Sequence, residues 1–167
     1  MNKISKCEIN DLTSQYDIIL LAETWLSEKQ ELNIKNYKAI LLNKEKINKF
    51  GRNNGGLAIL IRNNLCNKVK NIDIKSSNTL WISLESDNKN NEPPLIIALS
   101  YNPPNNSKYH NNELFTEMNN NLDYIRNNLK TDRILIIGDF NARIGSKNAN
   151  TINNLNKHNN ENNFIRK

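Results

Sequence analysis

Two apolar segments of the sequence each end in a carboxylate that is followed by small or polar residues. The stretch 17–23 ends at Glu23, and the stretch 133–138 is followed by Asp139 and Asn141. Ligands commonly bind beyond the carboxyl ends of strands in α/β proteins, because the loops there form crevices. Two acidic side chains from separate strand ends suit Mg²⁺, with Mn²⁺ as an alternative, since these ions prefer carboxylate and water oxygens.

The specificity of these patterns differs. A glutamate at a strand end is more often a solvated charge than a ligand, so Glu23 alone is weak evidence. The run Gly138-Asp139-Phe140-Asn141 is tighter, because the glycine permits a sharp exit and side chains two apart share one side of an extended chain. In the segment 98–104, a strand ends at Tyr101 and two prolines stop it. The Tyr101 hydroxyl either lies in water or stands beside a phosphate, where it would stabilise developing charge.

Short apolar blocks predict the strands that position these residues. The predicted strands cover residues 17–23, 37–42, 56–62, 80–85, 95–101 and 133–138. Between the last two, a helix over 110–129 is predicted from apolar residues at helical spacing: Leu114, Phe115, Met118, Leu122, Ile125 and Leu129. Residues 7–15 are typical of the last turns of a helix, and 28–32 of a short helical turn. Strands with a crossing helix predict an α/β fold with mixed strand directions.

Composition bounds the function only loosely. The 167 residues suffice for one domain, and 23 basic against 17 acidic residues give a net charge of +6. That excess suits a nucleic-acid partner, although a solvated lysine-rich surface needs none. Cys7 and Cys66 form neither a disulfide framework nor a zinc cluster. No signal peptide or membrane-spanning stretch is visible, which predicts a soluble intracellular protein without a membrane partner. Residues 146–167 are polar and rich in asparagine, which predicts a disordered tail.

Four ordered blocks, at residues 22–26, 55–62, 100–104 and 138–143, resemble the endonuclease/exonuclease/phosphatase superfamily. They are most similar to the apurinic-endonuclease-like domain of non-LTR retrotransposons. The resemblance implies a DNase I-like, four-layer α/β/β/α sandwich, present in part over residues 1–145. It also implies Mg²⁺-dependent phosphodiester hydrolysis by an enzyme that nicks DNA, works beside or fused to a reverse transcriptase, and is nuclear.

The same resemblance assigns roles to four residues. Glu23 matches the metal-binding glutamate, and Tyr101 matches the tyrosine that contacts the phosphate. Asp139 matches the aspartate that orients or deprotonates the attacking water, and Asn141 the amide that binds the phosphate. In contrast, Gly55, Gly56 and Arg62 are expected to be structural.

Two departures from the family pattern lead us to expect a chain that is cut short at both ends. The family opens with a strand that ends in an asparagine, and it closes with a Ser-Asp-His block; neither is found here. His110 and His158 are expected to be surface residues rather than substitutes. Three functions therefore stay open: a DNA-nicking endonuclease, a phosphatase of the same superfamily, and an inert remnant that at most binds nucleic acid. The missing block weighs against activity of this chain. Neither the target preference nor the oligomeric state follows from the sequence.

Overall fold

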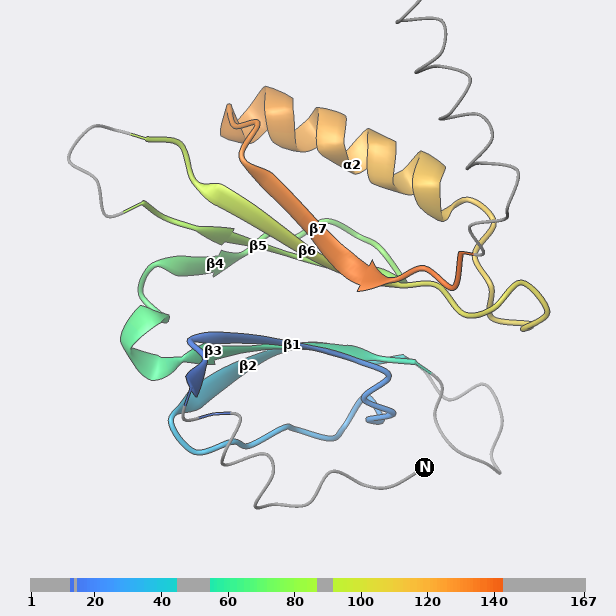
Figure 1. The fold of residues 1–167 in the computed structure, drawn as a ribbon, viewed down its shortest axis with the longest axis horizontal. Coiled ribbons are helices and arrows are strands. Elements are labelled where there is room, and N and C mark those ends of the chain that lie inside the picture. The colour runs from blue at the N-terminus through green and yellow to red at the C-terminus, as the bar shows by residue number, and fades with distance from the viewer. Residues whose placement is uncertain (1–12, 14, 45–54, 87–91, 143–167) are drawn as a thin grey trace, which may run out of the picture.

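The computed structural model describes residues 13, 15–44, 55–86 and 92–142, which form two β-sheets and one long helix (Figure 1). The first sheet contains β1 (Ile18–Ala22), β2 (Tyr37–Leu42) and β3 (Leu57–Arg62). The second contains β4 (Val69–Asn71), β5 (Thr79–Leu84), β6 (Leu95–Tyr101) and β7 (Ile134–Asp139). A 3₁₀ helix, η1 (Asn63–Leu65), follows β3, and α2 (Leu114–Leu129) connects β6 to β7.

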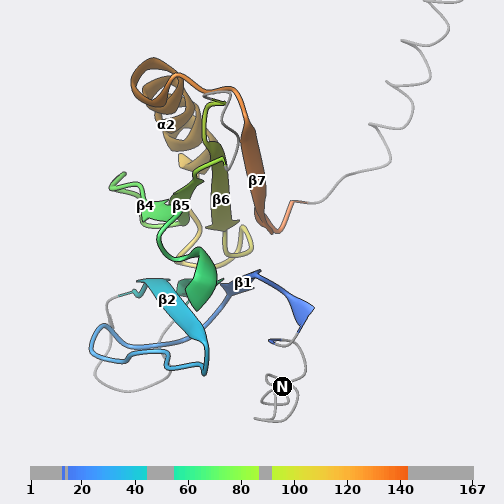
Figure 2. The ribbon, with the colours of Figure 1, turned by 90° about the vertical axis from the view of Figure 1, so that its left-hand side faces the viewer.

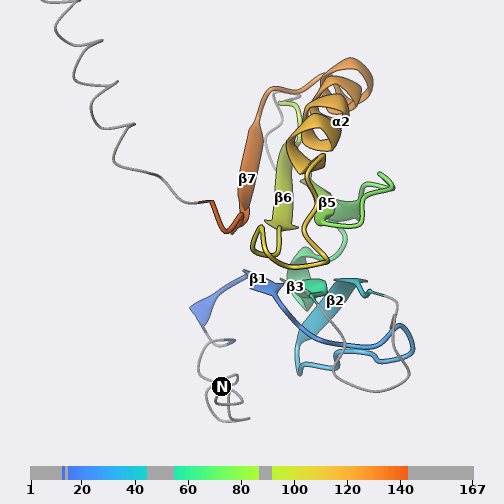
Figure 3. The same ribbon diagram turned by 90° about the vertical axis from the view of Figure 1, so that its right-hand side faces the viewer.

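The sheets face each other, and α2 covers the outer face of the second sheet (Figure 2). The first sheet has the order β1-β3-β2 and is antiparallel. The second has the order β4-β5-β6-β7, in which only the β6–β7 pair is parallel. A parallel pair needs a long crossover, and α2 supplies it. The view from the opposite side shows the same layers, with β7 at the edge of its sheet (Figure 3). The predicted mixture of strand directions is confirmed.

Two apolar cores fix these layers, and β6 contributes to both because its side chains alternate between the faces of the sheet. Ile97, Leu99 and Tyr101 pack between the sheets, whereas Ile96 and Ala98 pack beneath α2. Burying one large apolar side chain contributes about 1.5–3 kcal/mol. The carboxyl end of β6 therefore has a fixed position, and so does the tyrosine at that end.

All six predicted strands are confirmed to within one residue at each end. The helix begins at Leu114 rather than at residue 110, because the preceding backbone is engaged in loop contacts: His110 N–H donates to Ser107 O at 3.0 Å. Residues 28–32 form no helix; Gln30 N–H closes a single turn on Ser27 O. The predicted N-terminal helix lies largely outside the described residues, and the predicted tail at 146–167 lies wholly outside them.

One apolar side-chain prediction was wrong in detail. Phe115 does not belong to the buried face of α2, since 57% of its surface is exposed. The edge strand β7 also buries its residues incompletely: Leu135 is 45% and Ile137 41% exposed. β4 and η1 were not predicted, because three-residue elements carry too little periodic pattern to detect.

Candidate functional site

Glu23 lies in a turn directly after β1 that has an unusual backbone conformation. Glu23 has φ +57° and Trp25 has φ +52°, both in the left-handed region. Non-glycine residues in sparsely populated conformations cost about 1–3 kcal/mol, and they persist only when the surroundings enforce them. Here Trp25 N–H donates to Gly55 O at 2.8 Å, and Thr24 N–H to Gly56 O at 3.2 Å. The turn that presents the carboxylate is therefore held by the glycine pair before β3.

The two glycines are suited to this task for different reasons. Gly55 has φ +65° and Gly56 has φ +86°, so both occupy the left-handed region that favours glycine. A Cβ atom at Gly56 would also lie 2.5 Å from the Thr24 hydroxyl oxygen. The expectation that this pair is structural is consistent with its position, and the structure it supports is the Glu23 turn.

Tyr101 and Asp139 are neighbours at the carboxyl ends of the parallel strands β6 and β7, where they are register partners. Partners in register project to the same face of a sheet, here the face toward the first sheet. Gly138 makes this pairing possible, because a Cβ atom there would lie 1.9 Å from the Ser100 carbonyl oxygen. We expected this glycine to serve a sharp strand exit; instead it permits the close approach of two strands.

The Tyr101 hydroxyl donates a hydrogen bond to Oε1 of Glu23 and thereby joins the two strand ends across the sheets. Tyr101 is only 7% exposed. Burial raises the pKa of its phenol, and the hydrogen bond to Glu23 and the negative charges of Glu23 and Asp139 raise that pKa further. Tyr101 is therefore a protonated donor that faces two carboxylates, and the alternative of a hydroxyl lying in water was wrong.

Asn141 reaches the site through a turn rather than through strand alternation. β7 ends at Asp139, and Asn141 has φ +46°, so the expected extended arrangement of this pair was wrong. Asp139 Oδ1 accepts the Asn141 backbone N–H at 2.9 Å. The Asn141 side-chain amide donates to Asn102 O at 2.8 Å, and Asn102 N–H donates to Asp139 O at 2.9 Å. The loops after β6 and β7 are thus tied together around these residues.

Asn102 is a positioning residue that the sequence analysis missed. It is 3% exposed, and its amide exchanges two hydrogen bonds with the Asn111 backbone, at 3.0 and 3.1 Å. These bonds close the loop between β6 and α2 on itself. The available signal was an asparagine between a strand and two prolines, where a side-chain amide can replace lost backbone pairing.

Lys44 was also missed, since nothing in the Asn- and Lys-rich segment around it distinguishes it. It lines a cavity of about 100 Å³ together with Glu23, Trp25 and Tyr101. Its burial lowers the pKa of its amine. None of the ion pairs between residues that the structure describes involves Lys44. Because no carboxylate of the described residues forms an ion pair with this partly desolvated cation, an anionic ligand is favoured in this cavity.

The chemistry of the donors fits a hard divalent cation. Glu23 and Asp139 both act on Tyr101, so two carboxylates face one region of the molecule. Mg²⁺ keeps several waters and is usually bound through one or two carboxylates, which matches this donor set. Within the described ranges, no group of three or more His, Cys, Asp or Glu side chains could hold a metal ion.

Some of the predicted features lie outside the described residues, namely Cys7, Arg143 and His158. His110 is described, and it is not simply a surface residue. It lies in the loop before α2, is only partly exposed, and its Nδ1 is 2.6 Å from Pro103 O. Cys66 is a free thiol. Among the helices that the structure describes, none combines the length and apolar character needed to cross a bilayer.

Comparisons with known proteins identify relatives of the fold and of the sequence. The family model described as the Endonuclease/Exonuclease/phosphatase family matches residues 2–161. Among solved structures, the human Nocturnin catalytic domain with a bound sulfate anion matches with a TM-score of 0.54 at 21% identity. The match covers 83% of this chain and 56% of that one, so the chain spans little more than half of this relative. No curated protein matches. The predicted DNase I-like α/β architecture is confirmed.

Proposed function

Because the chain belongs to the Endonuclease/Exonuclease/phosphatase family, we propose that it is a divalent-metal-dependent phosphodiesterase that nicks DNA. We further propose that it is of the type carried by non-LTR retrotransposons, on the strength of the four ordered sequence blocks. The partners implied are DNA and a neighbouring or fused reverse transcriptase, and the implied location is the nucleus. The net charge of +6 is consistent with a polyanionic substrate.

One observation carries the proposal: the Tyr101 hydroxyl contacts the Glu23 carboxylate beside Asp139. These three residues come from three strand ends on two different sheets, and Tyr101 and Glu23 are 78 positions apart. Structural ion pairs also bring charges together, but here a buried phenol faces two carboxylates beside a cavity. Perturbed titratable groups in a cleft are typical of functional sites.

Glu23 would hold the metal ion, and Asp139 is the other carboxylate that acts on Tyr101. When bound, the ion would supply Lewis-acid polarisation of a phosphoryl oxygen and charge neutralisation at the leaving oxygen. Mg²⁺ is the first choice and Mn²⁺ the alternative, because the donors are oxygen atoms.

The side chains divide the remaining tasks. Asp139 has one oxygen occupied by the Asn141 N–H, which leaves the other to accept a proton from water. Tyr101 remains protonated, so it does not act as a base. Its single O–H, which Glu23 accepts in this structure, would turn to a phosphate oxygen once Glu23 holds the metal ion. Asn141 uses one amide hydrogen on Asn102, and its second hydrogen remains to donate to the phosphate. Lys44 adds a positive charge on the Glu23 side of the site.

A second candidate function is nucleic-acid binding without hydrolysis. It is favoured by the small donor set of the described residues, which includes no third acid or histidine grouped with the two carboxylates. Loss of one member of a cooperating catalytic set commonly lowers the rate by several powers of ten.

Nicking of supercoiled plasmid by the full 167-residue chain distinguishes these functions. We expect Mg²⁺-dependent conversion to open circles, lost in Glu23→Ala and in Asp139→Ala. The matched controls are Glu31→Ala and Asp73→Ala, two exposed acids away from the site, which should nick like the parent. Binding of the plasmid without Mg²⁺-dependent nicking would favour the second function. Nicking that survives in Glu23→Ala would remove the assigned site.

A further inference from the structure

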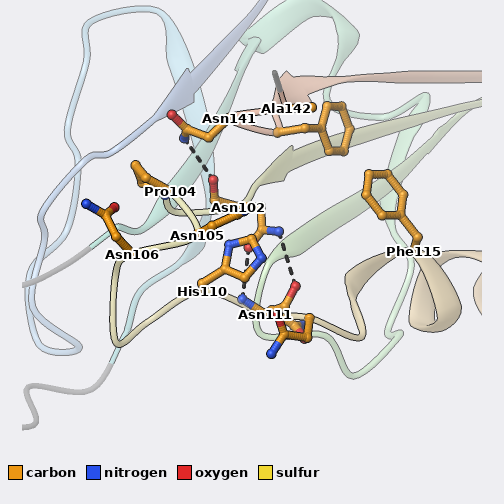
Figure 4. Close-up of a pocket in the computed structure, with 11 residues that line it drawn as sticks. Asn102, Pro104, Asn105, Asn106, His110, Asn111, Phe115, Asn141 and Ala142 are labelled. Atoms are coloured by element: carbon orange, nitrogen blue, oxygen red, sulfur yellow. Dashed lines mark hydrogen bonds between the residues drawn. The ribbon is translucent and has the colours of Figure 1, made fainter. Parts of the chain in front are cut away.

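A second and larger cavity adjoins the candidate site. It measures about 870 Å³ and lies between the loop after β6 and the loop after β7 (Figure 4). Asn141 belongs to its wall and is two residues from Asp139, so the cavity opens beside the phosphate-binding side of the proposed centre. Its side chains are Asn102, Pro104, Asn105, Asn106, His110, Asn111, Asn112, Phe115, Phe140, Asn141 and Ala142.

The lining is polar but contains no Asp, Glu, Lys or Arg. A phosphate would find no countercharge among these residues, in contrast to the small cavity that contains Lys44. Amides and an imidazole offer both donors and acceptors, and phenyl rings offer flat apolar faces. This combination fits a neutral, planar group with polar edges, which is the chemistry of a nucleobase.

Within the part of the chain that the structure describes, several of the polar groups are free to bind such an edge. Asn102 and Asn111 are committed to the loop, because they bond each other and, in the case of Asn111, also Glu117 at 3.2 Å. Among the described residues, the side chains of Asn105, Asn106 and Asn112 have no hydrogen-bond partner. These three amides therefore remain available to a ligand.

The His110 ring lines the same cavity and uses one of its two nitrogens in a contact with the loop. Since a carbonyl only accepts, Nδ1 of His110 donates to Pro103 O, and in the neutral ring Nε2 remains an acceptor. Figure 4 shows His110 among the labelled amides in the middle of the cavity wall. The cavity thus presents an imidazole acceptor together with amide donors.

Phe115 provides a stacking surface. It lies in the first turn of α2, is 57% exposed, and its ring stacks on Phe140 with centroids 5.8 Å apart and planes 23° from parallel. An exposed aromatic ring fixed by a second ring is the arrangement on which proteins stack unpaired bases. The exposure of Phe115, which its helical spacing did not predict, is explained if a base covers it.

We propose that this cavity binds an unpaired nucleobase next to the phosphate at the candidate centre, so that the substrate class is nucleic acid with an unstacked nucleotide. The inference rests on the proposed function, whose phosphate site adjoins the cavity. A base held here against Phe115 would set the register of the strand relative to Asp139.

The test measures binding of the full chain to fluorescent single-stranded oligonucleotides by anisotropy, at low salt and without a divalent ion. The probes are a thymine oligonucleotide and the same strand with abasic nucleotides, which keeps the phosphates and removes the bases. We expect the base-containing strand to bind about tenfold more tightly, and Phe115→Ala to lower its affinity about tenfold without affecting the abasic strand. Phe115→Leu, which retains the apolar contact with Phe140, should show the same loss if stacking is the cause.

Tyr124→Ala is the matched control, because Tyr124 is an aromatic residue on the same helix with 52% exposure and lies outside the cavity. Equal affinity for the two strands, no binding of either, or equal effects of the Phe115 and Tyr124 variants would overturn the inference. Base-dependent binding without plasmid nicking would retain the inference and reject hydrolysis. Plasmid nicking by the parent chain, together with an unchanged affinity of Phe115→Ala for the base-containing strand, would retain hydrolysis and reject the inference.

Discussion

The Tyr101 hydroxyl donates a hydrogen bond to the Glu23 carboxylate, and this contact connects the end of a strand in one sheet with the end of a strand in the other. Asp139 stands beside Tyr101 because the parallel pairing of β6 and β7 brings both residues to the same register position. The proposed centre is therefore a product of how the two sheets pack.

Tyr101→Phe removes the donor while it retains the buried ring. We expect the nicking rate to fall by about a factor of 10² to 10³, the effect of losing one donor that stabilises developing charge. Plasmid affinity should change little, because the loss applies to the transition state. The measurement is a single-turnover nicking rate at saturating protein, together with a circular-dichroism melt to show that the fold is intact. An unchanged rate in a folded variant would exclude Tyr101 from the chemistry.

Alkaline pH should destabilise the protein through Tyr101. The pKa of Tyr101 is raised in the folded state, so the native chain holds the phenolic proton more tightly than the unfolded chain does. The stabilisation is fully present below the unfolded pKa of about 10, and it is lost as the pH rises from there through the folded pKa. We expect the free energy of unfolding in urea to fall above about pH 10 in the parent, and to fall less steeply in Tyr101→Phe. Tyr124→Phe controls for the removal of a tyrosine. Parallel pH curves for parent and Tyr101→Phe would show that the linkage is absent.

Gly56→Ala should destabilise the turn that holds Glu23. The residue at this position has φ +86°, and the added methyl would meet the Thr24 hydroxyl at 2.5 Å. We expect a loss of about 2 kcal/mol in the free energy of unfolding, measured by urea denaturation. Among the described residues the Thr24 hydroxyl has no hydrogen-bond partner although it is buried, so Thr24→Ala alone should change stability by less than about 1 kcal/mol.

The double variant Gly56→Ala/Thr24→Ala separates the two causes. It relieves the steric clash and leaves the backbone strain. We therefore expect its loss in the free energy of unfolding to be about 1 kcal/mol smaller than the sum of the two single losses. Purely additive energies would mean that the clash with Thr24 contributes nothing.

Lys44→Met should weaken substrate binding without harming the fold. The variant removes a partly buried cation that has no ion-pair partner among the described residues. We expect about tenfold weaker binding of DNA. The slope of log affinity against log salt concentration should become shallower by about one unit, which corresponds to the loss of one phosphate contact. Lys70→Met is the control, because Lys70 is exposed and pairs with Glu85 far from the cavity.

The charge state of Lys44 gives a further expectation in the same titrations. Burial lowers the pKa of Lys44, so its charge is lost at a lower pH than that of an ordinary lysine. Lys44→Arg keeps its charge and should retain affinity to higher pH than the parent. An identical decline in the arginine variant would show that Lys44 is not the titrating group.

The sequence by itself determined the strands β1–β3 and β5–β7, the α/β class and the positions of the carboxylates at strand ends. An apolar run indicates a strand, because a strand that packs on both faces must be apolar at nearly every position. It does not fix the extent of burial, since the edge strand β7 leaves Leu135 and Ile137 partly exposed. Glu23 and Asp139 could be selected because each follows such a run. The beginning of α2 could not be predicted, since the loop before it uses side-chain and backbone bonds that periodicity does not report.

Only the tertiary structure decided which of these residues meet. The register between β6 and β7 is a nonlocal property, and a shift by one residue would turn Tyr101 or Asp139 to the opposite face. The left-handed conformations of Glu23 and Asn141 depend on hydrogen bonds from distant loops, as does the position of Asn102. Lys44 and Phe115 acquire their environments from packing between segments that are far apart in the chain. Local composition specifies what a segment can form, whereas the packing of distant segments sets which side chains share a site and how far water is excluded from it.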